Sequence, residues 1–272
     1  MLYAAAALVF GAGFPLLVLT EYTDKLFAWT IHPPLTASFL GACYWSAGIL
    51  EFCAARERSW CRARVAVPGV LLFTTLTCIT TYLNFSHFNL RSPVAYIWIA
   101  VYTSVPPALA VLWWREARAS GTDAPRDCRL PAWMRAGYAF LGLAMLITGA
   151  IMFFAPAAAG NLWPWDLNPP DSTYAHLSRM EPYVGVWLIG LGTVSAHASL
   201  EDDSLRLRCV FAAGLVLPPL TAVSIARYPQ TVLWHRPATT AMLGGLILLF
   251  VLSLAGWRLV RAAIPALQAG QK

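Results

Sequence analysis

The stretches "LFAWTIHPP" (26–34) and "LWPWDLNPP" (162–170) carry one aromatic-proline phrase at two places in the chain. The leucine, one tryptophan and both prolines of the first phrase recur 136 residues later, and the chain is 272 residues long. A phrase that recurs at half the chain length predicts two related halves.

Further matches follow in the same order along both halves, at an offset of 144 residues. They are Gly41 with Gly185, Gly48 with Gly192, Arg62 with Arg206, Arg64 with Arg208, and Pro93 with Pro237. An ordered set of matches indicates a duplication, so we predict two repeats, 1–130 and 131–272. We refer to these ranges as the first half and the second half.

The composition predicts an integral membrane protein. Hydrophobic residues make up 58% of the chain and charged residues 12%, with mean hydropathy +0.59. A soluble domain has about 25% charged residues. The basic residues stand in short arginine loops without the clustered basic face that nucleic-acid binding requires, so nucleic acid is excluded as a partner.

Apolar stretches long enough to cross a bilayer occur eight times, since a spanning helix needs about 20 mostly apolar residues. The predicted spans are 2–20, 35–54, 65–84, 94–114, 135–155, 182–200, 209–226 and 238–257. The predicted fold is therefore all-α, with eight transmembrane helices arranged as two parallel four-helix repeats. Both repeats then have the same orientation in the bilayer.

The loops between these spans differ in basic residues. Fourteen Lys and Arg residues fall on one side and five on the other: Lys25, Arg91, Arg179, Arg227 and Arg236. The positive-inside rule assigns the side with fourteen, and both termini, to the cytoplasm. Trp29 and Trp165 then lie outside, either as anchors at the membrane interface or as paired loops over a site between the halves.

The outer loops supply the candidate ligand-binding residues. The segment 163–182 is longer than its counterpart and carries His176 and Arg179, so we expect it to form a polar lid. Arg227, His235 and Arg236 bracket another outer turn. Arginines in such a cluster can hold an anionic ligand by charge-assisted hydrogen bonds.

Histidines offer a second kind of site, because imidazole is the commonest metal ligand in proteins. Paired histidines at equal depth on facing helices could ligate a metal or haem, and only His87 with His235 fits that requirement. No pair of cysteines is spaced as CxxC, so the sequence predicts no thiolate metal site. The sequence contains no enzyme signature, and it does not identify a cofactor.

Glu51 is the one acid well inside a predicted span, near its inner end. An acid at membrane depth is unfavourable by about 2.5–3.5 kcal/mol on insertion scales unless it is paired or hydrated. Arg56 or Arg58 could neutralise it, and a functional role is the alternative.

The phrase at 162–169 resembles a Leu-Trp-Pro-Trp-x-Leu-x-Pro pattern of uncharacterised bacterial multi-pass membrane proteins. The resemblance implies a bacterial inner membrane and no particular activity. Our leading hypothesis is a carrier or binding protein for a small anionic or lipid-like ligand on the outer side. The alternatives are a metal- or haem-containing membrane enzyme or redox subunit, and an accessory subunit that packs on a membrane-protein partner.

Overall fold

Helices are the only regular elements in the described part of the chain, residues 2–57, 59–119, 126, 128–168 and 179–269 of the computed structural model. The long helices are α1 (Leu2–Leu17), α3 (Pro34–Ala55), α5 (Val67–Leu83), α6 (Pro93–Arg118), α7 (Ala132–Phe154), α8 (Glu181–Glu201), α9 (Arg208–Arg227) and α10 (Pro237–Ala269). Two single-turn helices, α2 (Thr23–Leu26) and α4 (Trp60–Ala63), lie in the connections. The prediction of an all-α fold is confirmed.

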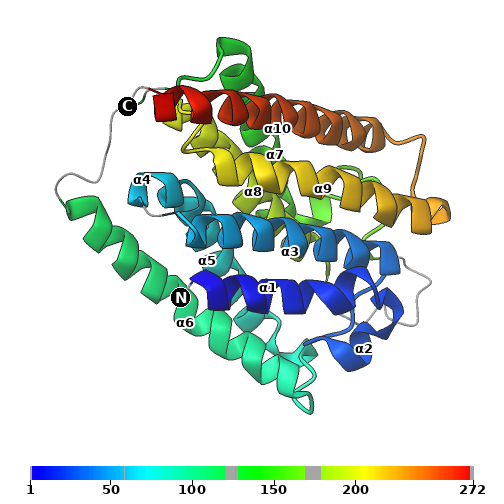
Figure 1. The fold of residues 1–272 in the computed structure, drawn as a ribbon. Coiled ribbons are helices and arrows are strands. Elements are labelled where there is room, and N and C mark those ends of the chain that lie inside the picture. The colour runs from blue at the N-terminus through cyan, green and yellow to red at the C-terminus, as the bar shows by residue number, and fades with distance from the viewer. Residues whose placement is uncertain (1, 58, 120–125, 127, 169–178, 270–272) are drawn as a thin grey trace.

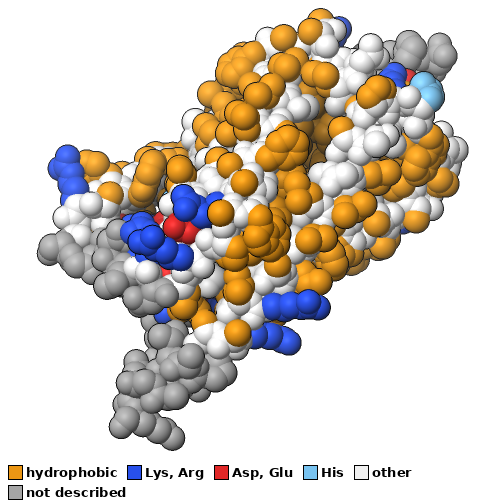
Figure 2. Space-filling model, turned by 90° about the horizontal axis from the view of Figure 1, so that it is seen from above, with side chains coloured by type: hydrophobic (Ala, Val, Ile, Leu, Met, Phe, Trp, Pro, Cys, Tyr) orange, Lys and Arg blue, Asp and Glu red, His pale blue; other side chains and the backbone are white. Residues whose placement is uncertain are grey.

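Seven helical segments are long and apolar enough to cross a membrane, and each overlaps one predicted span. They are Pro34–Ala55, Trp60–Leu83, Pro93–Arg118, Ala132–Phe154, Glu181–Glu201, Arg208–Arg227 and Pro237–Ala263. Hydrophobic side chains cover much of the surface, and the arginines gather toward one end (Figure 2). A multi-pass membrane protein therefore accounts for both the helices and the surface.

The first predicted span, 2–20, differs from the structure. α1 has 16 residues, which at 1.5 Å per residue is about 24 Å, short of the roughly 30 Å of hydrocarbon. After Leu17 the chain turns by 98° into the Thr20–Leu26 segment, and only this bent pair taken together would make an eighth span. Seven spans are thus supported, and the eighth is not.

Prolines begin several of the long helices. Pro34, Pro93 and Pro237 each occupy the first position of a helix, where the missing N–H would have had no partner within the helix. The Ser92 hydroxyl caps α6 by accepting a 3.3 Å hydrogen bond from the Val94 amide. The sequence thus fixes where these helices start.

The long helices form two layers of four (Figure 1). In one layer the neighbours follow the order α1, α3, α9 and α10, and in the other α6, α5, α8 and α7. The seam between the halves therefore runs along α3 with α9 in one layer and α5 with α8 in the other. One cluster of buried side chains crosses this seam and joins Trp29 and Tyr44 to Trp165 and Trp187.

Two glycines at matching positions permit close helix approach. A Cβ added at Gly41 in α3 would overlap the backbone at Leu17 of α1. A Cβ at Gly185 in α8 would lie 3.0 Å from the Phe153 amide nitrogen of α7. Gly185 follows Gly41 by 144 residues, and Phe153 follows Leu17 by 136. The first two long helices of each half thus touch at corresponding points.

Candidate functional site

Trp29 and Trp165 are buried, and each packs on a helix of the other half. Trp29 is 3% exposed, and its ring lies 4.8 Å from that of Tyr183 in α8. The Trp165 ring is 5.9 Å from that of Phe39 in α3, and its Nε1 donates a 2.9 Å hydrogen bond to Thr36 Oγ1. The two side chains therefore fasten the loops to the protein and do not anchor them in the lipid interface.

A backbone hydrogen bond ties each of these loops to a turn of its own half. The Asn89 amide donates to the Ala28 carbonyl at 2.9 Å, and the Leu233 amide donates to the Pro164 carbonyl at 2.8 Å. The two donors are 144 residues apart and the two acceptors are 136 residues apart, which are the offsets at which the sequence matches recur. The loops thus share one mode of attachment.

The side chains beneath the two loops differ in size. Beneath the first loop, Trp98 packs 4.8 Å from Trp29, and Tyr102 lies 4.3 Å from Trp98, measured between ring centroids. At an offset of 144 residues, Trp98 and Tyr102 correspond to Met242 and Leu246. The smaller side chains leave space beneath the second loop that rings fill beneath the first.

A cavity of about 450 Å³ occupies that space, among α7, α8, α9 and α10. Its wall includes Trp163 of the loop, Leu141 of α7, and Ala241 and Met242 of α10. Among the described residues of the wall, Thr148 alone carries a hydroxyl, and none carries a charge. This volume lies within the roughly 300–1,000 Å³ of small-molecule sites.

Arg236 lies beside the loop end of this apolar cavity. Its Nη1 donates to the carbonyls of Gly160 and Trp163, at 3.1 Å and 3.4 Å. Its Nη2 donates to Asp166 Oδ1 at 2.7 Å, and the Asp166 side chain is about half exposed. The guanidinium is thus partly neutralised, and the pair offers a donor and an acceptor side by side.

The remaining predicted ligand-binding residues have other positions. Arg227 donates to the carbonyls of Leu17 and Val18 at the end of α1. His235 and Arg179 are exposed, and His176 lies outside the described residues. Ligand binding by these four residues stays a prediction.

The histidines predicted to share a metal or haem belong to different hairpins. His87 stands in the turn before α6, and His235 in the turn before α10. These two helices lie at opposite ends of the two layers (Figure 1). Burial lowers the pKa of a further histidine, His32, which lies in the first tryptophan loop, and the Asp24 carboxylate opposes that shift. Metal binding by His87 and His235 stays a prediction.

Glu51 borders a second, central cavity of about 80 Å³, whose wall comes from both halves. The residue is 7% exposed, and its Oε2 has no hydrogen-bond partner among the described residues. Ser195 stands at the corresponding position of the second half and lines the same cavity. Arg56 is exposed and lies over the Phe52 ring, 5.8 Å from its centroid. The carboxyl is thus buried on the seam without a counter-ion in the described chain.

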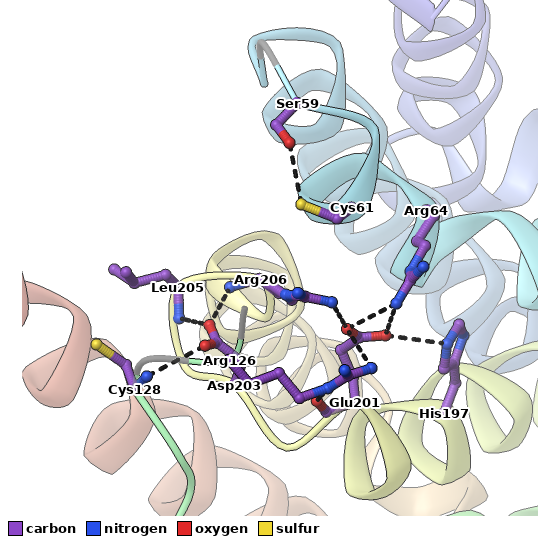
Figure 3. Close-up of polar contacts among 10 residues, drawn as sticks. All are labelled: Ser59, Cys61, Arg64, Arg126, Cys128, His197, Glu201, Asp203, Leu205 and Arg206. Atoms are coloured by element: carbon purple, nitrogen blue, oxygen red, sulfur yellow. Dashed lines mark hydrogen bonds and ion pairs between the residues drawn. The ribbon is translucent and has the colours of Figure 1, made fainter. Parts of the chain in front are cut away.

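At the opposite end from the tryptophan loops, Glu201 gathers basic side chains from several segments (Figure 3). Its side chain is 2% exposed and lies 3.1 Å from Arg64, 2.5 Å from Arg206 and 3.5 Å from Arg126. His197 Nε2 is 3.6 Å from the same carboxylate. Partners of this kind compensate a buried carboxylate for its lost hydration.

A matching ion pair joins the acid of the first half to an arginine of the second. Arg208 Nη2 lies 2.9 Å from Glu57 Oε1, just as Arg64 pairs with Glu201. The two arginines are 144 residues apart in sequence, and so are the two glutamates. Each pair joins an acid at the end of α3 or α8 to an arginine of the other half. This cluster was not predicted from the sequence, although the matching of Arg62 and Arg64 with Arg206 and Arg208 pointed to it.

No known protein family, curated protein or solved structure matches this chain. The site is therefore interpreted from its own geometry.

We expect Trp165→Phe to destabilise the protein more than Trp29→Phe. Both changes remove similar ring area, but only Trp165 makes an Nε1 hydrogen bond, while Trp29 Nε1 has no partner among the described residues. The difference in the free energy of unfolding should be about 1 kcal/mol, measured by thermal unfolding in detergent. Equal losses would contradict this account.

Glu201→Gln should lower the free energy of unfolding by about 3 kcal/mol or more, since the buried Arg206 guanidinium then loses the Glu201 charge. Glu21→Gln, at an exposed position, is the control and should change stability little. Near-native stability of the Glu201 variant would show that the cluster is not essential to the fold.

Glu51→Leu should raise the stability, because an unpaired buried polar group is unfavourable by about 1–3 kcal/mol. Ser195→Ala, on the same cavity wall, should have a smaller effect. If Glu51→Leu lowers the midpoint of thermal unfolding, the carboxyl has a structural partner in the folded protein.

Proposed function

We propose that this multi-pass membrane protein is a carrier or binding protein for a lipid-like ligand with one acyl chain. The observation that carries the proposal is the 450 Å³ apolar cavity beneath the second tryptophan loop. Its wall residues Met242 and Leu246 stand where the first half has the rings of Trp98 and Tyr102.

The chemistry of the wall favours a hydrocarbon chain as the occupant. Leucine, methionine, alanine and glycine dominate it, and Leu162, Trp163 and Pro164 of the loop line it as well. Lipid tails are as apolar as leucine, so a chain that leaves the bilayer for this cavity gains little hydrophobic free energy. Selection among lipids must then come from the polar end.

Arg236 and Asp166 are the groups at that end. Their 2.7 Å contact leaves both a cation and an anion next to the cavity, with Asp166 the more exposed of the two. A zwitterionic head group can pair with both charges, whereas an anionic head group would meet the Asp166 carboxylate as well. We therefore favour a zwitterionic single-chain amphiphile, with Arg227, His235, Arg179 and His176 as further candidate contacts.

The proposal includes an orientation and an architecture. Fourteen basic residues on one side of the predicted spans and five on the other support cytoplasmic termini and an extracytoplasmic position for the tryptophan loops in a bacterial inner membrane. The matched contacts of Gly41 with Leu17 and of Gly185 with Phe153 support two four-helix repeats. An eighth span would consist of α1 with the segment that follows it.

The ligand proposal predicts that Ala241→Phe, which fills the cavity from α10, abolishes binding of a nitroxide-labelled lysophosphatidylcholine. Electron paramagnetic resonance of the protein in nanodiscs should show an immobilised spectral component for the wild type that the variant lacks. Ala100→Phe, on an exposed face of α6, is the matched control and should retain that component.

Two outcomes would contradict the proposal. One is an immobilised component that is equal in the wild type and in Ala241→Phe. The other is an immobilised component that is absent from the wild type with both the zwitterionic probe and labelled lysophosphatidylglycerol.

A further inference from the structure

Three side chains with metal-ligating atoms meet across the seam at the arginine-rich end. Cys53 lies in the last turn of α3, Glu57 follows that helix, and Cys209 lies in the first turn of α9. One ligand atom from each lies within 4.8 Å of the other two, and Cys209 Sγ is 3.9 Å from Glu57 Oε1. The cysteines are 156 residues apart in sequence, so spacing alone could not reveal the group.

The cluster is shielded from solvent without being closed. Cys209 is fully buried, and the Glu57 side chain is 6% exposed, while Cys53 is partly exposed. Both thiols are free. Buried ligands with one accessible edge give an ion a route of entry and leave one coordination position open to water.

The positions related to these three by the offset of 144 residues show what is particular to this cluster. There, His197, Glu201 and Val65 stand at the positions that correspond to Cys53, Glu57 and Cys209. Glu201 meets three arginines, whereas Glu57 meets one, Arg208, among the described residues. The Glu57 carboxylate thus has less positive charge around it and two sulfur atoms beside it.

We propose that Cys53, Glu57 and Cys209 bind one divalent cation of the zinc class. Two thiolates and a carboxylate are suitable ligands for zinc, and a tetrahedral site places such atoms about 3.3–3.8 Å apart. The 3.9 Å separation of Cys209 Sγ and Glu57 Oε1 needs only a small side-chain adjustment.

Charge and protons balance at this site. Binding displaces the two thiol protons to solvent. Two thiolates, the Glu57 carboxylate, the Arg208 guanidinium and a divalent cation then sum to zero formal charge. The bound ion would link α3 to α9, and so the first half to the second. In the other layer, the ion pair of Arg64 with Glu201 makes the corresponding link.

The test is a Co²⁺ titration of the reduced, chelator-treated full chain in detergent. We expect thiolate-to-cobalt charge-transfer and visible d–d bands that saturate at one ion per chain, and their loss when Zn²⁺ is added. Cys53→Ser and Cys209→Ser should each abolish the charge-transfer bands of the two-thiolate site. Cys61→Ser, a buried cysteine at the same end that contacts Ser59, is the control and should keep them.

Glu57→Gln tests the site in case the serine variants do not fold, because it leaves both sulfur atoms in place. It should keep the thiolate bands and weaken Co²⁺ binding by about tenfold or more. The proposal is overturned if the wild type shows no thiolate bands, or if the bands persist unchanged in Cys53→Ser. It is also overturned if mass spectrometry of freshly purified protein finds a Cys53–Cys209 disulfide.

Discussion

Shielded backbone groups need partners inside the protein, because lipid cannot supply hydrogen bonds. Helices meet this need along their length, but the last carbonyls of each helix have no hydrogen-bond donor within the helix. Here arginines close several of them. Arg227 donates to Leu17 and Val18 at the end of α1, and Arg126 Nε donates to the Glu201 carbonyl at the end of α8. Exposed arginines at the helix ends thus supply hydrogen bonds that the helices themselves cannot make.

The seam between the halves is held at both of its ends. At one end each tryptophan loop packs on a helix of the other half, and at the other end Glu201 and Glu57 each pair with an arginine across the seam. Between these ends lies the small central cavity, where Glu51 Oε2 has no hydrogen-bond partner among the described residues. A buried polar group without a hydrogen bond lowers stability. The middle of the seam therefore contributes less to the free energy of unfolding than its two ends.

Corresponding backbone positions carry different chemistry in the two halves. Trp98 and Tyr102 fill the space beneath the first loop, whereas smaller side chains at the corresponding positions leave a cavity beneath the second. At the arginine-rich end, one acid stands among arginines and the other stands beside Cys53 and Cys209. In both places the side chains at positions 144 residues apart differ in size or charge. The proposed lipid site and the proposed metal site both lie where the halves differ.

The sequence by itself determined the membrane class and seven of the helices, because apolar runs and proline starts are local properties. It overestimated the span at 2–20, since hydropathy does not register a 98° turn held in part by Arg227, 210 residues away. It left open whether Trp29 and Trp165 anchor at the lipid interface or form paired loops over a site between the halves. Only the tertiary structure decided that Trp165 is buried against Thr36 and that Cys53 meets Cys209. Those contacts join residues far apart in the chain, and the free energy of such packing depends on shape and burial, which no local pattern encodes.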